Sequence, residues 1–164
     1  MTVTPIPTAD LYDRYGEALD LCTAPLRRIG GRAVFAGPVR TLSCHEDNAL
    51  LRELVNTPGE GAVLVVDGGG SPRTALVGDL IAGAARRNGW AGLIINGSVR
   101  DSVALGELDL GIKALGTIPR KSGKTGAGAV DGPVTFGEVT FRPGDSVYAD
   151  DDGVAVLPAG SATA

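Results

Sequence analysis

Three short apolar runs decide the fold: AVLVV at residues 62–66, AGLIIN at residues 91–96 and GIKALG at residues 111–116. Apolar runs without polar alternation are typical of strands that are buried on both faces, as in a parallel sheet. An amphipathic helical pattern at residues 78–87 separates the first two runs, and a second helical pattern precedes the third. The order strand, helix, strand, helix, strand is that of parallel crossover units. The centre of the chain is therefore predicted to be a parallel α/β sheet.

The segment before this centre predicts two helices and one strand. A short helix is expected to begin at Thr8-Ala9-Asp10, and a strand is expected over residues 32–44, broken at Gly37-Pro38 by a bulge or bend. Asp47 is expected to cap the second helix, which ends at residues 57–59.

The segment after the centre predicts antiparallel hairpins. A polar loop at residues 118–132 is followed by short apolar stretches at 134–136, 139–141, 146–149 and 154–156. The fold class is therefore expected to be α/β, with a parallel central sheet flanked by antiparallel hairpins. Because no linker or repeat interrupts the pattern, we expect one domain over residues 1–164 with its core at about residues 8–157.

Composition argues against several classes of function. Hydrophobic residues make up 43% of the 164 residues and charged residues 21%, as in an ordinary globular protein. With 4% aromatic residues and a formal net charge of −4, no direct nucleic-acid binding is expected. Cys22 and Cys44 lie outside any CxxC motif, which indicates neither a disulfide framework nor a zinc site. No apolar run approaches the ~18 residues of a membrane span, so we expect a cytoplasmic protein without a membrane partner.

Two strand–helix junctions carry the residues best suited to chemistry. The strand at 62–66 leads through a glycine loop to a helix that begins at Gly78-Asp79, and the strand at 91–96 leads directly to Arg100-Asp101. In open α/β sheets, ligands bind beyond the carboxyl ends of the strands. Both junctions lie on that edge, so we expect them to contribute to one site.

The two junctions together would hold a small anion beside a divalent metal. Arg100 presents a planar fork that matches a carboxylate or phosphate, and Asp101 offers a hard oxygen ligand for Mg²⁺ or Mn²⁺. Both aspartates are also ordinary helix caps, and Arg100 is also an ordinary surface ion-pair partner. The first turn of the first helix is expected to offer free backbone N–H groups at the positive end of the helix dipole, those of Gly78, Asp79, Leu80 and Ile81.

The spacing of these residues resembles a known family signature. Asp79, twenty intervening residues and then Arg100-Asp101 is similar to the D-x20-R-D signature of class II 4-hydroxy-4-methyl-2-oxoglutarate aldolases, which the regulator of ribonuclease activity A proteins share. The resemblance runs from about Thr8 to Leu157. Its clearest stretches are TALVGDLIAGAARRNGWAGLIINGSVRD, LDLGIKALGTIPRKSGKTGAG and VTFGEVTFRPGDSVYADDDGVAVL.

The resemblance implies a swivelling β/β/α fold assembled as a homotrimeric ring, or as a hexamer, with sites at subunit interfaces. It implies that the N–H groups of residues 78–81 and Arg100 bind a pyruvate-like 2-oxo acid, that Asp101 holds Mg²⁺ or Mn²⁺, and that Asp79 positions a proton-shuttling water. The implied reactions are retro-aldol cleavage of 4-hydroxy-4-methyl-2-oxoglutarate to two pyruvates and decarboxylation of oxaloacetate. Aldolase members usually extend further past Leu157 than this chain, whereas the ribonuclease regulators are also short.

Other motifs have plainer explanations. The loop at residues 68–70 superficially resembles that of S-adenosylmethionine methyltransferases, and members of the family carry demethylmenaquinone methyltransferase labels on such grounds, but no helix pattern follows these glycines directly. Lys121 and Lys124 are expected to be solvated in their loop, or else to cover a neighbouring subunit's site. His45 lacks zinc-ligand spacing, and residues 150–153 predict a hairpin turn rather than a calcium loop.

Three functional hypotheses follow. The leading one is a metal-dependent lyase on small 2-oxo acids, in which the 2-oxo acid chelates the metal and the metal stabilises the developing enolate. The second is a protein regulator that binds and inhibits a ribonuclease E-type enzyme without touching RNA. The third is a ring-forming scaffold with a vestigial site, against which the presence of Asp79, Arg100 and Asp101 together argues.

Overall fold

Four parallel strands form the centre of the sheet: the three that the sequence predicts and, beside them, the strand expected at residues 32–44. The computed structural model describes residues 2–161. The central strands, in their order across the sheet, are β3 (Phe35–Ser43), β4 (Val63–Asp67), β6 (Gly92–Val99) and β7 (Gly111–Thr117). The helices that connect them are α2 (Ala49–Val55), α3 (Asp79–Arg87) and α4 (Ser102–Gly106). Each connection joins two neighbouring strands, so the predicted crossover order is confirmed.

Antiparallel strands extend this centre on both sides. Beyond β3 lie β11 (Ser146–Asp150), β12 (Gly153–Leu157) and β1 (Asp20–Leu21), and beyond β7 lies β2 (Arg27–Arg28). The remaining strands are β5 (Ala75–Val77) beside β6, β8 (Ala129–Val130) beside β3, and the hairpin of β9 (Val134–Phe136) and β10 (Val139–Phe141). The predicted fold class is confirmed as a curled mixed sheet with antiparallel hairpins, whereas the short strands β1, β2, β5 and β8 are not foreseen by the sequence patterns.

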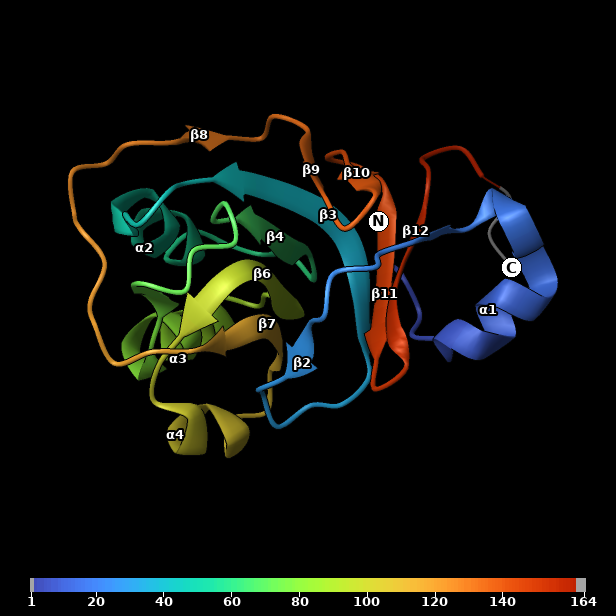
Figure 1. The fold of residues 1–164 in the computed structure, drawn as a ribbon. Coiled ribbons are helices and arrows are strands. Elements are labelled where there is room, and N and C mark those ends of the chain that lie inside the picture. The colour runs from blue at the N-terminus through green and yellow to red at the C-terminus, as the bar shows by residue number, and fades with distance from the viewer. Residues whose placement is uncertain (1, 162–164) are drawn as a thin grey trace.

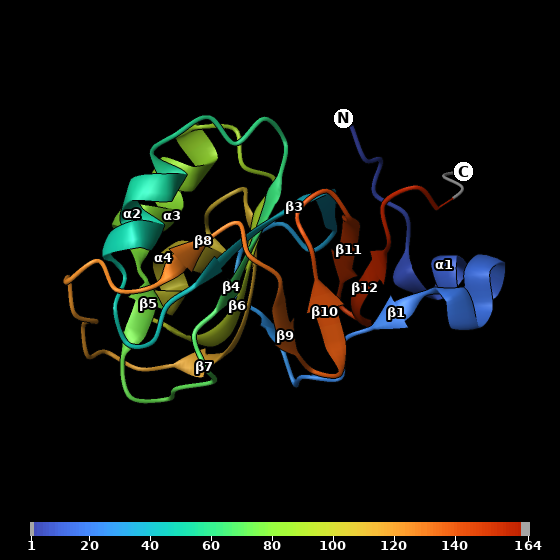
Figure 2. The same ribbon diagram turned by 90° about the horizontal axis from the view of Figure 1, so that it is seen from above.

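Helices and hairpins cover opposite faces of the parallel strands. Figure 2 shows α2, α3 and α4 on one face and the strands β9 to β12 on the other, with α1 (Thr8–Tyr15) and the short helix η1 (Gly16–Ala18) beyond them. One apolar core packs α2 and α3 against the sheet, and a second fills the space between the sheet and the hairpins. A third, smaller core joins α1 to β11 and β12. Both faces of the central strands are therefore buried, which explains their unbroken apolar sequences.

The ring of Phe35 explains two glycines in the parallel strands. Gly92 of β6 and Gly111 of β7 lie against this ring, and a Cβ at either position would overlap it. The aromatic side chain thus takes the place that two side chains would otherwise fill. Close packing at this point fixes the second core against the sheet.

The bulge or bend predicted at Gly37-Pro38 does not interrupt β3, which runs through both residues without a shift in register (Figure 1). Residues 35–38 pair with β11, and residues 39–43 pair with β4 on the other edge. Pro38 lacks an N–H group and cannot donate to a neighbouring strand. It stands where β3 exchanges one partner for the other, so the ladder tolerates it.

Asp47 anchors the loop at residues 118–132 rather than capping α2, which begins after Asn48. Its carboxylate accepts hydrogen bonds from the backbone and hydroxyl of Thr125 and from the Gly126 N–H, and only a longer bond, 3.3 Å, from Ala49 N. Burial alone would raise the pKa of Asp47, but these hydrogen bonds together hold it below its ordinary value. The loop is therefore fastened to the start of α2 by a buried carboxylate.

Residues 150–153 form the predicted hairpin turn, between β11 and β12. The Asp150 carboxylate accepts hydrogen bonds from the N–H groups of Asp152 and Gly153 inside the turn. It also accepts two bonds of 2.7 Å from the N–H and hydroxyl of Thr8. This aspartate therefore joins the turn to the predicted helix at Thr8.

The third crossover helix is short and only partly covered. α4 ends at Gly106, and within it Val103 is 78% exposed whereas Leu105 is fully buried. Among residues 2–161, no helix has the length and apolar character needed to cross a membrane.

Candidate functional site

The two predicted junctions meet at the carboxyl edge of the sheet. Asp101, two residues after the end of β6, accepts a hydrogen bond at its Oδ2 from the Asp79 N–H at 3.0 Å. A Cβ on Gly78 would lie 2.7 Å from Asp101 Oδ2 and 3.4 Å from Arg100 Cγ and Nε. Only a residue without a side chain leaves both groups in place. The structure therefore brings together the residues that the sequence separates by about twenty positions.

The first turn of α3 is open, although not in full. The expectation that the Asp79 N–H is free is wrong, because this group donates a hydrogen bond to Asp101. Within residues 2–161, the N–H groups of Gly78, Leu80 and Ile81 donate no hydrogen bond. The Leu80 side chain is 82% exposed. Three backbone donors at the positive end of the helix dipole thus remain for an anion.

Asp101 has an unusual backbone conformation. Its φ of 60° and ψ of 41° lie in the left-handed region, which costs energy for residues other than glycine. The side chain makes no capping bond to α4, so the predicted role as an ordinary cap does not account for it. Its carboxylate turns instead toward the start of α3. Strain of this kind concentrates at functional sites.

Arg100 is half-buried and lies at the side of a pocket. Its Nη1 donates a long hydrogen bond of 3.4 Å to the carbonyl of Pro119. It forms no ion pair with a carboxylate of the described residues, so it is not the surface ion-pair partner that the sequence left open. The guanidinium is therefore available to a ligand.

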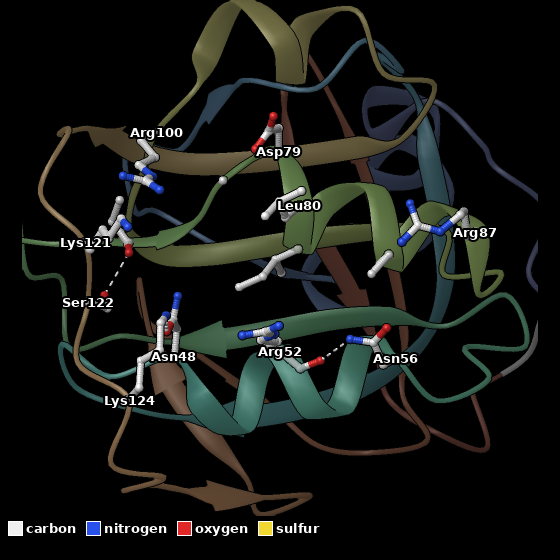
Figure 3. Close-up of a pocket in the computed structure, with 14 residues that line it drawn as sticks. Asn48, Arg52, Asn56, Asp79, Leu80, Arg87, Arg100, Lys121, Ser122 and Lys124 are labelled. Atoms are coloured by element: carbon white, nitrogen blue, oxygen red, sulfur yellow. Dashed lines mark hydrogen bonds between the residues drawn. The ribbon is translucent and has the colours of Figure 1, made fainter.

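The pocket beside Arg100, whose lining side chains Figure 3 shows, is of substantial size. Its volume is about 430 Å³. It lies between α2 and α3 and is bordered by the loop after β7. This volume falls within the range of about 300–1,000 Å³ that is usual for small-molecule sites. Its lining residues are Asn48, Arg52, Asn56, Ala75, Gly78, Asp79, Leu80, Ile81, Ala84, Arg87, Arg100, Lys121, Ser122 and Lys124.

The lining of this pocket is strongly cationic, in a protein with a net charge of −4. Asp79 is its only acidic residue, against five basic side chains, those of Arg52, Arg87, Arg100, Lys121 and Lys124. None of the five forms an ion pair with a carboxylate of residues 2–161, although Arg28, Arg32, Arg40 and Arg73 elsewhere all do. The arrangement can therefore attract and hold an anion.

Both loop lysines, Lys121 and Lys124, are exposed, as expected, and both also line the pocket. Lys124 Nζ donates a 2.8 Å hydrogen bond to Asn48 Oδ1, and Asn48 Nδ2 in turn donates to the Leu76 carbonyl. Ser122 Oγ donates to the Ala75 carbonyl and fixes the loop at its middle. These bonds, with those of Asp47, hold the loop against the pocket.

One carboxylate is suitably placed for a divalent metal. Among the described residues, no group of three or more His, Cys, Asp or Glu side chains gathers as a metal cage. Mg²⁺ usually keeps several waters and takes one or two carboxylates together with oxygens of the substrate. Asp101 is exposed, and only its Oδ2 accepts a hydrogen bond, so it fits such an ion. The residues present thus fit a metal that is held jointly with a ligand.

The remaining motifs lie away from this chemistry. The glycines at residues 68–70 are followed by β5 rather than by a helix, so the arrangement of a methyltransferase glycine loop is absent there. His45 is exposed and lies 3.6 Å from Glu46, which Arg73 and Ser71 also contact. Burial raises the pKa of the Cys44 thiol to about 12, which excludes it as a nucleophile at neutral pH.

Comparison with known proteins agrees with this architecture. A structure from Geobacillus kaustophilus described as an S-adenosylmethionine:2-dimethylmenaquinone methyltransferase is 46% identical, over 95% of this chain and 97% of that one, with a TM-score of 0.92. The RNA-processing inhibitor RraA from Thermus thermophilis is 44% identical, over 99% and 96% of the two chains, with a TM-score of 0.90. A Streptomyces coelicolor protein, described as an unusual member of the RNase ES inhibitor RraA protein family, is 30% identical over 95% of this chain and 81% of that one, with a TM-score of 0.73.

The family model matches almost the whole of the predicted core. It spans residues 8–156 and is described as RraA-like, Aldolase/RraA. That description covers both aldolases and RraA proteins, so it does not decide between an enzyme and a regulator. On this match and on these identities, the chain belongs to the RraA-like (Aldolase/RraA) family.

Proposed function

We propose that the protein is a divalent-metal-dependent carbon–carbon lyase that decarboxylates oxaloacetate and cleaves 4-hydroxy-4-methyl-2-oxoglutarate to pyruvate. The observation that carries this proposal is the convergence of Gly78, Asp79 and Arg100 in the lining of a cationic pocket, with the Asp101 carboxylate directly beside Gly78 and Asp79. Both reactions act on small anionic 2-oxo acids, and both leave electrons on C3 of a pyruvate fragment.

The chain's own groups bind and orient the 2-oxo acid. Arg100 pairs with its carboxylate, and the free N–H groups of Gly78, Leu80 and Ile81 donate to its oxygens at the helix terminus. Two kinds of donor at one carboxylate fix its orientation as well as its position, which lowers the entropy cost of reaching the transition state.

Asp101 would hold the metal, Mg²⁺ or Mn²⁺, together with water and the substrate. When bound, such an ion supplies a positive charge that stabilises the electrons left on the pyruvate fragment. The hydrogen bond from the Asp79 N–H fixes the Asp101 carboxylate for this task. The Asp79 carboxylate is exposed beside it and would position the water that accepts the C4 hydroxyl proton in aldol cleavage. Decarboxylation requires no such base, so it is the less demanding of the two reactions.

We also propose that the protein assembles as a homotrimer, or as a hexamer built from trimers. Leu80 and Val103 expose apolar side chains close to Asp79 and Asp101, and such side chains are suited to contact with a second copy. The two free cysteines agree with a reducing cytoplasm. Light scattering coupled to gel filtration measures the assembly directly.

The decisive experiment is pyruvate release from oxaloacetate by the purified protein with Mg²⁺, with EDTA, and in an Arg100→Ala variant. Metal-dependent release that disappears in the variant is expected, because Arg100 is the half-buried cation at the mouth of the site. Release no faster than that caused by the metal alone would refute the proposal.

A second function is favoured by one specific observation, the 44% identity to the RNA-processing inhibitor RraA from Thermus thermophilis. We infer from it a protein regulator that binds a ribonuclease E-type enzyme. The net charge of −4 favours contact with the ribonuclease protein rather than with RNA. Co-purification with the host ribonuclease and slower RNA cleavage in its presence would support this role, and no recovery of the ribonuclease would count against it.

A further inference from the structure

Two arginines that line the pocket away from Arg100, Arg52 and Arg87, have no task in the chemistry described above. Arg52 lies on α2 and Arg87 on α3, and Figure 3 shows Arg87 on the opposite side of the pocket from Arg100. Neither forms an ion pair with a described carboxylate. Their positive charges therefore face the pocket without compensation from the described part of the chain.

Local sequence gives Arg87 the room to reach the pocket. A Cβ on Gly83, one turn earlier in α3, would lie only 3.2 Å from Arg87 Nη1. The guanidinium thus lies back along the helix over a position that carries no side chain, in the direction in which helical side chains point. Asn56 Nδ2 donates to the Arg52 carbonyl at 2.7 Å, which supports the last turn of α2 beside it.

The size of the pocket exceeds what the reacting end of a substrate requires. A four-carbon acid is far smaller than the drug-sized ligands that occupy pockets of about 300–1,000 Å³, and this pocket has about 430 Å³. The space beyond Arg100 is lined by the polar and basic side chains of Arg52, Asn56 and Arg87 and, between them and Arg100, by the apolar side chains of Leu80, Ile81 and Ala84. Such a lining favours a ligand that is charged at both ends.

We propose that Arg52 and Arg87 form a second anion subsite, which selects 2-oxo acids that carry a carboxylate at the end remote from the 2-oxo group. The inference rests on the proposed function, because it assigns the 2-oxo acid end of the ligand to Arg100 and the start of α3. In aldol cleavage the subsite holds the carboxylate of the fragment that leaves as the second 2-oxo acid. A 2-oxo acid of equal length with an apolar end makes no charge contact with this subsite and therefore binds more weakly.

Two unreactive ligands test the subsite without any turnover. 2-Oxoglutarate and 2-oxopentanoate have the same five carbons and differ only in a terminal carboxylate against a methyl group. Titration calorimetry at fixed ionic strength with Mg²⁺ is expected to give about tenfold tighter binding of 2-oxoglutarate, as two rim-exposed charge contacts provide. The double variant Arg52→Gln/Arg87→Gln is expected to remove this preference and to leave 2-oxopentanoate binding unchanged within about twofold.

Arg86→Gln is the matched control, because Arg86 is exposed on the same helix but does not line the pocket. Its loss of one positive charge should leave the preference intact. Equal affinities for the two ligands in the unmodified protein, a preference that survives in the double variant, or an equal loss in Arg86→Gln would each overturn the subsite. Pyruvate release is measured in parallel: a preference without any turnover would refute the lyase and keep the subsite, whereas turnover without a preference would refute the subsite alone.

Discussion

Replacing Gly78 with alanine tests whether contact between the two junctions matters for activity. The backbone at Gly78, with φ of −127° and ψ of −165°, is extended and open to any residue, so alanine introduces no backbone strain. The new Cβ would lie 2.7 Å from Asp101 Oδ2, a separation at which the carboxylate must move. Its hydrogen bond from the Asp79 N–H, now 3.0 Å, would then be lost.

The expected effect falls on activity and not on stability. A hydrogen bond to a charged group contributes about 1.5–3 kcal/mol. Because Asp101 is exposed, the bond from the Asp79 N–H to its carboxylate lies at the lower end of that range. Displacement of a positioning group by about 1 Å costs up to about a hundredfold in rate. We therefore expect kcat/KM for oxaloacetate to fall between about tenfold and a hundredfold. The loss of chain entropy in the unfolded state stabilises an alanine variant by about 0.4–1 kcal/mol, so Tm should change by no more than about 4 °C.

The assay is Mg²⁺-dependent pyruvate release, coupled to NADH oxidation by lactate dehydrogenase, with a thermal melt of each variant. Gly116→Ala is the matched control, because a Cβ there has no atom within 4 Å and Gly116 does not line the pocket. The reasoning is refuted if Gly78→Ala keeps its activity within about twofold of the parent protein, or if Gly116→Ala loses as much.

Two further predictions concern the metal and the loop. The Asp101→Asn variant should fold normally but show no Mg²⁺-dependent activity, since it lacks the carboxylate that is placed for the ion. An active variant whose activity depends on Mg²⁺ concentration as in the parent protein would exclude Asp101 as the ligand. Asp47→Asn should lower Tm by about 4–10 °C at pH 7, because a neutral amide replaces the acceptor of hydrogen bonds from Thr125 and Gly126. The pKa of Asp47 is lower in the folded protein than its ordinary 3.8, so this stabilisation is complete above about pH 4 and is lost as the pH falls through the folded-state value. The Tm difference between the two proteins should accordingly narrow only in acid, and a difference that stays constant down to pH 2 would contradict the role of the charge.

The parallel centre of the fold could be predicted because its signals are local. Each of the strands β4, β6 and β7 is a continuous apolar run, and burial on both faces requires that run wherever the partners come from. The unbroken course of β3 could not be predicted. Proline normally ends a ladder, and it is tolerated at Pro38 only because the strand changes partners there. That exchange depends on β11, more than one hundred residues away in the chain.

Some residues of the candidate site could likewise be predicted from the sequence, and others could not. Arg100 could be predicted because it directly follows β6, whose end lies on the ligand-binding edge. Gly78 could be predicted as the start of the helix pattern that follows the apolar run at residues 62–66, although the intervening β5 could not. Arg52 and Arg87 could not, since they are exposed arginines on amphipathic helices and resemble ordinary surface residues in sequence. The only available signal was topological: crossovers between neighbouring parallel strands place α2 and α3 side by side on one face. Lys124 reaches the pocket through the bonds of Asp47 and Asn48 to its loop, which no local pattern reveals.

The charge distribution separates the two proposed functions. A net charge of −4 argues against a nucleic-acid surface, yet it is compatible with a concave pocket in which five basic side chains meet one aspartate. Unpaired cations in a concave site suit a small anion, whereas stable contact with another protein buries about 1,200–2,000 Å² and involves the surrounding surface. The functions therefore place different demands on the molecule. Arg100→Ala should abolish 2-oxo acid chemistry and leave a ribonuclease contact intact, so that loss of both activities in this one variant would mean that they share the pocket.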